Sequence, residues 1–278
     1  MKLYITDLDG TLLNSEKEIS AFSKSTLNTL ISKGVNFSIA SARSLSTALK
    51  ILSGLKLNAP IALMNGVALY DMESGKYINI EALAQEPAEE IVNILKMRRV
   101  EGFMYTISDG VLNTYYETLS SNVLTDFRDE RIKKYNKTFE QIENFKDKIS
   151  ENNIIYFTLL DEYETLIKVY ETLKDMPGIE ISLYKDVYSD NLYFLEIYSK
   201  NASKRNAVNY LRENYNFDEI IGFGDNLNDI PMLKACDEFY AVANAVDELK
   251  KLATGVIGDN DSDGVAKYIA KKECLEGY

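Results

Sequence analysis

Two aspartates stand directly behind a short apolar run near the start of the chain. The segment Asp7-Leu8-Asp9-Gly10-Thr11-Leu12 follows residues 3–5, which are all apolar. The run predicts a short buried strand, and side chains two residues apart on an extended chain point the same way. Two carboxylates so placed can hold a divalent cation and leave one oxygen free as a nucleophile. The alternative is an ordinary polar turn, because Asp-Gly is common in turns.

Strand and helix patterns alternate at both ends of the chain. Strands are predicted at residues 3–6, 35–40 and 60–64, with helices between them that Ser20 begins and Gly34 and Gly54 end. The same alternation returns near the C-terminus, with strands predicted at 219–223, 239–243 and 255–257. Strands that alternate with helices predict an α/β fold with a parallel sheet and right-handed crossovers.

The middle of the chain has a different pattern. Residues 103–107 and 111–115 flank Ser108-Asp109-Gly110, which is typical of a hairpin. Strands at 154–160, 179–184 and 193–198 accompany a helix around 166–173, so strands outnumber helices. We therefore expect an α+β domain at 83–198, inserted into an α/β domain formed by 1–82 and 199–278.

Composition excludes several kinds of chemistry. The 278 residues contain no histidine, which rules out Ser-His-Asp and Cys-His hydrolysis and histidine zinc sites. The two cysteines, Cys236 and Cys274, give neither a metal spacing nor a disulfide framework. The net charge of −12 argues against nucleic-acid binding, and an anionic substrate would need local cations or a metal.

The distribution of apolar residues argues against a membrane protein. No run approaches the roughly 18 to 20 apolar residues that cross a bilayer. The first residues lack the basic, apolar and small-residue pattern of a signal peptide. We therefore expect no membrane partner and a cytoplasmic location.

Four polar segments lie at predicted strand ends or helix starts of the α/β domain. They are Asp7 with Asp9, Ser41 with Arg43, Lys204, and Gly224-Asp225-Asn226-Leu227-Asn228-Asp229. Because ligands bind at the carboxyl ends of parallel strands, we expect the four to share one rim. Each has a simpler explanation: Ser41 as a helix cap, Arg43 in a surface ion pair, Lys204 as a solvated charge, and the last segment as a capping loop.

A second acidic segment imitates a calcium loop. Asp259-Asn260-Asp261-Ser262-Asp263-Gly264 matches the start of an EF-hand loop, but Ala270 occupies the position of the bidentate glutamate. A turn that caps the last helix is the better interpretation.

The four polar segments resemble the four motifs of the haloacid dehalogenase superfamily. The insertion between the second and third motifs resembles the Cof-type branch, the IIB sugar-phosphatase group. Asn65-Gly66, Val242-Ala243-Asn244-Ala245 and Asp263-Gly264-Val265-Ala266 also resemble that branch. The resemblance implies a Rossmann-like core with a C2B-type α+β cap that selects the substrate. Ser41 and Ala42 stand where a threonine and a glycine are more usual in the family, which keeps the hydroxyl.

The resemblance also implies a role for each site residue in a magnesium-dependent phosphatase. Asp7 would attack phosphorus and form an aspartyl phosphate, and the Asp9 side chain would act as the acid and base. Mg²⁺ would be held by Asp7, the Asp9 main-chain carbonyl and Asp225. The phosphoryl group would be bound by Ser41, Arg43, Lys204 and Asn228, and Asp229 with Asn228 would orient Lys204 and the metal ligands.

The expected substrate is a sugar phosphate or a similar small phosphorylated metabolite, and the protein is expected to be a monomer or weak homo-oligomer. A phosphomannomutase-like phosphosugar mutase remains an alternative, as does a noncatalytic sensor of metal and phosphate. The sensor is disfavoured because both Asp7 and Asp9 are present.

Overall fold

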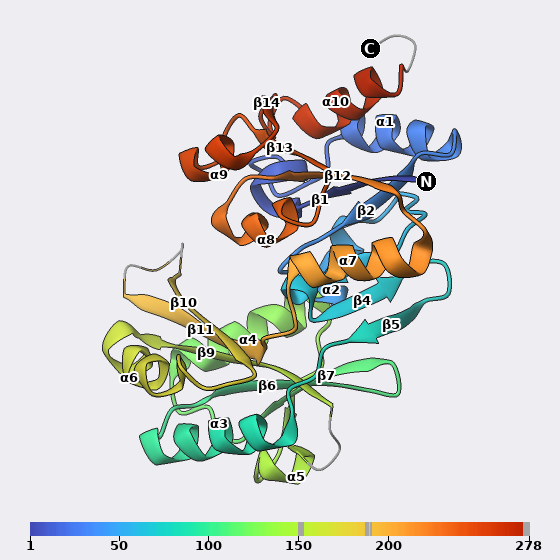
Figure 1. Cartoon of the computed structure of the whole chain (residues 1–278). Helices are drawn as coiled ribbons and strands as arrows, with labels where there is room; N and C mark the ends of the chain where they lie inside the picture. The colour runs from blue at the N-terminus through green and yellow to red at the C-terminus, as the bar shows by residue number, and fades with distance from the viewer. Residues whose placement is uncertain (150–152, 187–188, 190, 275–278) are drawn as a thin grey trace. The chain divides into compact units, whose positions relative to one another are not determined.

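The structure is a computed structural model that describes residues 1–149, 153–186, 189 and 191–274. It contains two compact units (Figure 1). The core unit comprises Met1–Asn79 and Ser203–Tyr278, and the inserted unit comprises Ile80–Ala202. No helix among the described residues is long and apolar enough to span a bilayer.

A parallel sheet of five strands forms the centre of the core unit. Its strands are β1 (Lys2–Thr6), β2 (Asn36–Ile39), β12 (Glu219–Gly224), β13 (Glu238–Val242) and β14 (Gly255–Ile257). Their order in the sheet is β14-β13-β12-β1-β2, so β1 lies beside β12 although more than 200 residues separate them. The apolar side chains of β1 and β12 are buried, as their sequences predict.

Helices cover both faces of this sheet. In Figure 1, α1 (Ala21–Ser32) and α10 (Gly264–Lys272) lie together on one face, and α7 (Lys204–Tyr215) and α8 (Ile230–Leu233) lie on the other. The shorter helices α2 (Leu45–Ile51) and α9 (Asp247–Leu252) complete the unit. Ser20 caps α1, as predicted, by accepting a hydrogen bond from the backbone N–H of Ser23 at 2.9 Å.

The third predicted strand of the N-terminal half does not extend the parallel sheet. β3 (Ile61–Leu63) pairs antiparallel with β4 (Ala68–Asp71), and β5 (Lys76–Ile80) completes a separate three-stranded sheet. Only a single parallel bridge, between Ala40 and Ala62, links β3 to the strand before it. The third strand is thus present and meets the preceding strand in the parallel direction, but its ladder there is a single bridge and its main pairing is antiparallel with the unpredicted strand β4.

The inserted unit is built on a mixed sheet of six strands. They are β6 (Gly102–Ser108), β7 (Val111–Tyr116), β8 (Glu140–Gln141), β9 (Ile154–Glu162), β10 (Ile179–Lys185) and β11 (Leu192–Ser199). Their order is β10-β11-β9-β6-β7-β8, and the pairs are antiparallel except for β7 with β8. The predicted hairpin turn joins β6 to β7.

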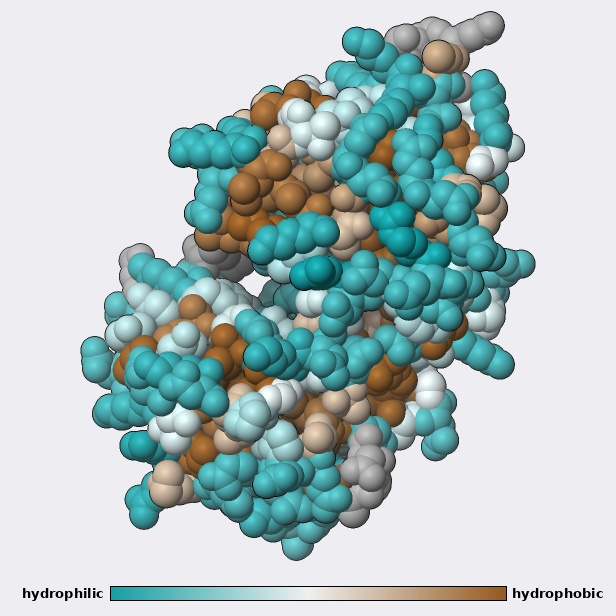
Figure 2. Space-filling view, in the orientation of Figure 1, coloured by the Kyte–Doolittle hydropathy of each residue, from teal (hydrophilic) through white to brown (hydrophobic). Residues whose placement is uncertain are grey.

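The two faces of the inserted sheet are covered differently. The helices α3 (Gln85–Arg98), α5 (Lys146–Ile149) and α6 (Tyr163–Leu173) contribute to one apolar core with the sheet. Across the sheet, α4 (Asn122–Tyr135) places Phe127 against Phe103 and Phe194. The architecture is thus an α/β core with a parallel five-stranded sheet and an inserted α+β cap. Hydrophilic side chains dominate the face in Figure 2, with smaller hydrophobic patches between them.

Candidate active site

The pairing of β1 with β12 brings the two acidic segments of the core unit together. Thr6 lies opposite Phe223, and the backbone N–H of Asp7 donates to the carbonyl of Phe223 at 3.0 Å. Asp7 therefore leaves the sheet beside the end of β12, where Asp225 begins the next loop. This is the rim that the carboxyl ends of parallel strands were expected to form.

Lys204 is buried between two aspartates. It is the first residue of α7, which Ser203 caps, and it is only 2% exposed. Its ammonium Nζ lies 2.7 Å from Asp7 Oδ1 and 2.6 Å from Asp229 Oδ1. Burial alone lowers the pKa of Lys204, but the negative charges of Asp7 and Asp229 outweigh it and hold the pKa above its ordinary value. Lys204 is thus a fixed buried cation and not a solvated helix charge.

Three carboxylates share this small space. Oxygens of Asp7, Asp225 and Asp229 lie within 4.8 Å of one another. Burial, with the charge of Asp229, raises the pKa of Asp7 to about 7 even though Lys204 opposes the shift. Burial and the charge of Asp229 likewise raise the pKa of Asp225 to about 6. The cluster therefore holds more negative charge than one ammonium group balances.

A tight turn carries the chain from Asp7 past Asp225. Residues Leu8–Leu12 form a wide helical turn that is interrupted at Asp9 and Gly10. Gly10 has a φ of +75°, and a Cβ at this position would lie 2.5 Å from Asp225 Oδ2. Thr11 Oγ1 donates to Asp225 Oδ1 at 3.0 Å. The glycine thus lets the turn approach the Asp225 carboxylate closely enough for Thr11 to hold it.

Replacing Gly10 with alanine is expected to displace Asp225 and strain the turn. The positive φ and the close carboxylate both oppose a Cβ, at a cost of roughly 1–3 kcal/mol in unfolding free energy. Thermal unfolding should show a lower midpoint than the wild type. Gly34→Ala is a control of similar backbone strain, because Gly34 has a φ of +92° but a Cβ added there would meet no atom within 4 Å. We expect only the Gly10 variant to lose the phosphatase activity that the sequence motifs imply, and equal activity in both variants would contradict this expectation.

Asp9 lies outside the carboxylate cluster. Arg43 Nε donates to Asp9 Oδ2 at 2.7 Å, and Arg43 Nη2 donates to Asp9 Oδ1 at 2.6 Å. The side chain of Asp9 is 48% exposed, whereas that of Arg43 is 17% exposed. The structure thus joins Asp9 and Arg43, both predicted site residues, in a bidentate ion pair that is partly exposed to solvent.

Ser41 lies in a backbone loop that a second turn supports. Ser41 is 1% exposed, and its hydroxyl accepts from the backbone N–H of Arg43 at 3.2 Å. The backbone N–H groups of Met64 and Asn65 donate to the carbonyls of Arg43 and Ser41 at 3.1 and 3.0 Å. Ser44, not Ser41, occupies the N-cap position of α2, so the capping explanation for Ser41 fails.

The two remaining predicted residues have different surroundings. Asp229 is fully buried, and its Oδ2 accepts from the backbone N–H groups of Asp225 and Asn226 at 3.0 and 3.2 Å. Asp229 thereby orders the 225–229 loop and holds Lys204 with its other oxygen. Asn228 is exposed, and its side chain makes no hydrogen bond to the rest of the described ranges. The structure therefore does not bring Asn228 into the cluster.

The donor set fits a divalent cation. Carboxylate oxygens are preferred ligands of Mg²⁺, and the surplus negative charge of the cluster favours a cation there. Both oxygens of Asp229 already accept hydrogen bonds from Lys204 and from the backbone. Asp7 and Asp225 are therefore better placed than Asp229 to bind a metal directly.

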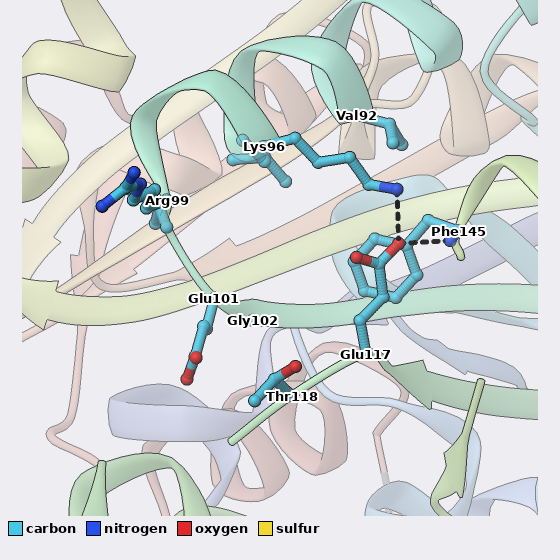
Figure 3. Close-up of a pocket in the computed structure, with 10 residues that line it drawn as sticks. Val92, Lys96, Arg99, Glu101, Gly102, Glu117, Thr118 and Phe145 are labelled. Carbon is cyan, nitrogen blue, oxygen red and sulfur yellow. Dashed lines mark hydrogen bonds and ion pairs between the residues drawn. The ribbon is translucent and has the colours of Figure 1, made fainter. Parts of the chain in front are cut away.

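A pocket in the inserted unit has no part in this cluster. It has a volume of about 160 Å³ and is lined by α3, the segment that joins α3 to β6, the two residues that follow β7, and Phe145 (Figure 3). Lys96 Nζ lies 3.3 Å from Glu117 Oε1, which also accepts from the backbone N–H of Phe145 at 2.5 Å. These polar groups satisfy one another, and none of the predicted site residues lines the pocket.

Comparison with known proteins identifies the family. The sequence model of the haloacid dehalogenase-like hydrolase family matches residues 4–269 of this chain. Phosphatase YwpJ of Bacillus subtilis is 26% identical over 96% of this chain and 98% of its own length. Pyridoxal phosphate phosphatase YbhA of Escherichia coli is 25% identical over 95% of each chain. The solved structure of the subclass IIB sugar phosphatase BT4131 has the same fold, with a TM-score of 0.74, 20% identity, and coverage of 99% of this chain and 100% of that one. The chain therefore belongs to the haloacid dehalogenase-like hydrolase family, as one of its phosphatases.

Proposed function

We propose that this protein is a Mg²⁺-dependent phosphomonoester hydrolase that works through an aspartyl phosphate on Asp7. The observation that carries the proposal is the buried position of Asp7, held between the ammonium of Lys204 and the carboxylates of Asp225 and Asp229. A carboxylate that attacks a phosphate dianion needs nearby positive charge. Lys204 supplies a permanent part of that charge.

Asp7 is oriented for attack by its bond from Lys204. Holding one carboxylate oxygen fixes the direction of the other, which reduces the entropy lost on reaching the transition state. The attack forms a bond between Asp7 and phosphorus and breaks the ester bond to the alcohol. Ser41, Lys204 and Asn228 bind the phosphoryl oxygens in this proposal, and Asn228 must turn toward the site to do so.

Asp9 gives its proton to the departing alcohol and then takes a proton from the water that hydrolyses the aspartyl phosphate. In the present structure both Asp9 oxygens accept from Arg43. An incoming phosphate offers Arg43 a second anionic partner. We therefore expect Arg43 to shift toward the phosphate and release the Asp9 carboxylate, which takes up a proton from solvent and then gives it to the alcohol.

Mg²⁺ bound by Asp7, Asp225 and the main-chain carbonyl of Asp9 would supply the charge that neutralises the phosphoryl oxygens. Thr11 and Gly10 place Asp225 for this role. Asp229 orients Lys204 and orders the loop that carries Asp225.

The proposed substrates are small phosphorylated metabolites, with sugar phosphates as the first class to test. The names of YbhA and BT4131 indicate pyridoxal phosphate and sugar phosphates as substrates of those proteins. Because these relatives act on different alcohols, the common element is the phosphate monoester that the core unit binds. The inserted unit is proposed to select among the alcohols.

Release of inorganic phosphate from a panel of esters tests the proposal. The panel contains p-nitrophenyl phosphate, hexose phosphates, pentose phosphates, nucleotides and cofactor phosphates, each with Mg²⁺ and with chelator. Hydrolysis of small esters in Mg²⁺ and its loss in chelator are expected. Isomerised sugar phosphate without free phosphate, dependent on a sugar bisphosphate, would favour the mutase. Binding of metal and phosphate without turnover would favour the sensor.

A further inference from the structure

The acidic loop at residues 259–263 has no role in the proposed mechanism. It precedes α10 and lies in the core unit, as does the turn that carries Asp9. Asn260 Nδ2 donates to the carbonyl of Leu13 at 2.9 Å, directly after that turn. A loop almost 250 residues away in sequence therefore contacts the segment that presents Asp9.

Two carboxylates of this loop, those of Asp261 and Asp263, accept hydrogen bonds from the segment that follows the turn. Asp261 accepts from the backbone N–H of Ser15 at 2.7 Å and from its hydroxyl at 2.6 Å. Asp263 accepts from the hydroxyls of Ser20 and Ser23. These hydrogen bonds give the carboxylates of Asp261 and Asp263 partners within the protein. The expected turn does precede α10, with Asp263 at its N-cap position, although the Asp263 side chain makes no capping hydrogen bond to the helix.

The side chain of Asn244 links the backbone of Asn260 to Gly10. The backbone N–H of Asn260 donates to Asn244 Oδ1 at 3.1 Å, and Asn244 Nδ2 donates to the carbonyl of Gly10 at 2.8 Å. Since the oxygen of Asn244 is held by an N–H donor, its amide nitrogen must face Gly10. The orientation of Asn244 is thus set by the 259–263 loop.

The turn needs external support at this point. Asp9 has a ψ of 123° and Gly10 a φ of 75°, so the backbone is not helical at these two residues. Thr11 ties the far side of the turn to Asp225, and Leu13 closes it with a backbone bond to Leu8 at 2.9 Å. The carbonyl of Gly10, next to Asp9, is held by Asn244.

We propose that Asn244 and Asn260 are positioning residues that aim Asp9 at the leaving alcohol. The inference rests on the proposed function. Loss of either side chain frees the carbonyl of Gly10 or Leu13 and lets the Asp9 segment change direction. Among the described residues, neither asparagine side chain is hydrogen-bonded to Asp7 or Lys204, so this buried pair should keep its geometry.

Leaving-group dependence tests this role. p-Nitrophenolate departs without a proton, whereas an alkoxide needs one from Asp9. The measured quantity is kcat/KM, which reports the steps up to release of the alcohol and not the later hydrolysis of the aspartyl phosphate. Asn244→Ala and Asn260→Ala are expected to lower kcat/KM by about 10-fold or more for an alkyl phosphate, but less than about 3-fold for p-nitrophenyl phosphate. Asp9→Asn should show the same selectivity with a larger loss.

Ser262→Ala is the matched control. Its hydroxyl donates at 3.2 Å to the Asp259 carbonyl within the same loop and does not contact the turn. In this variant kcat/KM should stay near the wild-type value for both esters.

The positioning role would be overturned if the asparagine variants lost kcat/KM equally on both esters, or lost it on neither ester. The proposed function would still stand in that case, because the wild type would still hydrolyse the esters. A wild type that hydrolyses neither ester would overturn the proposed function and this inference with it. Asn260→Ala keeps the backbone bond to Asn244, so a folded variant remains if Asn244→Ala unfolds.

Discussion

Replacing Asp7 with asparagine is expected to abolish turnover, with kcat lower by about 10³-fold or more. The amide is nearly isosteric with the carboxylate, yet it is a poor nucleophile and a weaker metal ligand. Phosphate release from p-nitrophenyl phosphate measures the effect. Asp237→Asn is a control in the same unit, because Asp237 accepts from Arg212 and from the backbone N–H of Ile220, away from the cluster. Retained activity in the Asp7 variant would contradict the assignment of the nucleophile.

The same Asp7 variant is expected to be more stable than the wild type in metal-free buffer at pH 8. Folding raises the pKa of Asp7 from about 3.8 to about 7, mainly through burial, so its ionised form opposes folding. Removing that charge should increase the unfolding free energy by at least about 1 kcal/mol, or roughly 2–4 °C in Tm. Excess Mg²⁺ should raise the Tm of the wild type and should stabilise the variant less, since one ligand is lost.

The pH dependence of this difference has a definite sign. Between the unfolded and folded pKa values the folded protein binds more protons at Asp7, so the stability of the wild type falls as pH rises. The Tm gap between variant and wild type should therefore be small near pH 4 and grow toward pH 8. Metal-free thermal unfolding across this range measures it. A gap that is constant with pH, or that widens toward acid, would show that Asp7 ionisation does not oppose folding.

Replacing Lys204 with methionine is expected to have the largest effect on stability. The ammonium is buried and bonds both Asp7 and Asp229, so its removal leaves two buried carboxylates without a cation. Breaking a buried ion pair on one side costs about 3–5 kcal/mol in unfolding free energy. Activity should fall as well, because the phosphoryl group loses its fixed positive charge. Chemical denaturation monitored by circular dichroism measures the stability.

Lys234→Met is the control for this substitution, because Lys234 is exposed on the same unit. Its effect is expected to stay within about 0.5 kcal/mol. The loss in the Lys204 variant should diminish at acid pH, where Asp7 becomes protonated and part of the uncompensated charge disappears. Equal stability of the two lysine variants at pH 8 would contradict a structural charge role for Lys204.

The parts of the fold that depend on local pattern could be predicted from the sequence. Apolar runs located β1 and β12, and the Asp-Gly dipeptide located the turn between β6 and β7. The rule that ligands gather at the carboxyl ends of parallel strands then placed Asp7 near Asp225. These features follow from runs of apolar residues and from residue pairs that favour turns, and both can be read in a single sequence.

Features that depend on long-range pairing could not be predicted in this way. No local pattern shows that β3 pairs with β4, that Arg43 bonds Asp9, or that Asp263 bonds the hydroxyls of α1. Thr11 was missed as a support for Asp225, although its place next to Gly10 in the acidic segment was a usable signal. Each of these contacts joins groups whose approach is decided only by the packed fold.

Chemical trapping of the intermediate tests the central claim most directly. The enzyme is quenched during turnover of p-nitrophenyl phosphate, reduced with borohydride, digested and analysed by mass spectrometry. An acyl phosphate at Asp7 would be reduced to homoserine, and Asp9→Asn should increase the yield because it slows hydrolysis of the intermediate. The account predicts homoserine at position 7. Turnover with Asp7 unmodified in both proteins, or with the reduced residue at another carboxylate, would contradict it.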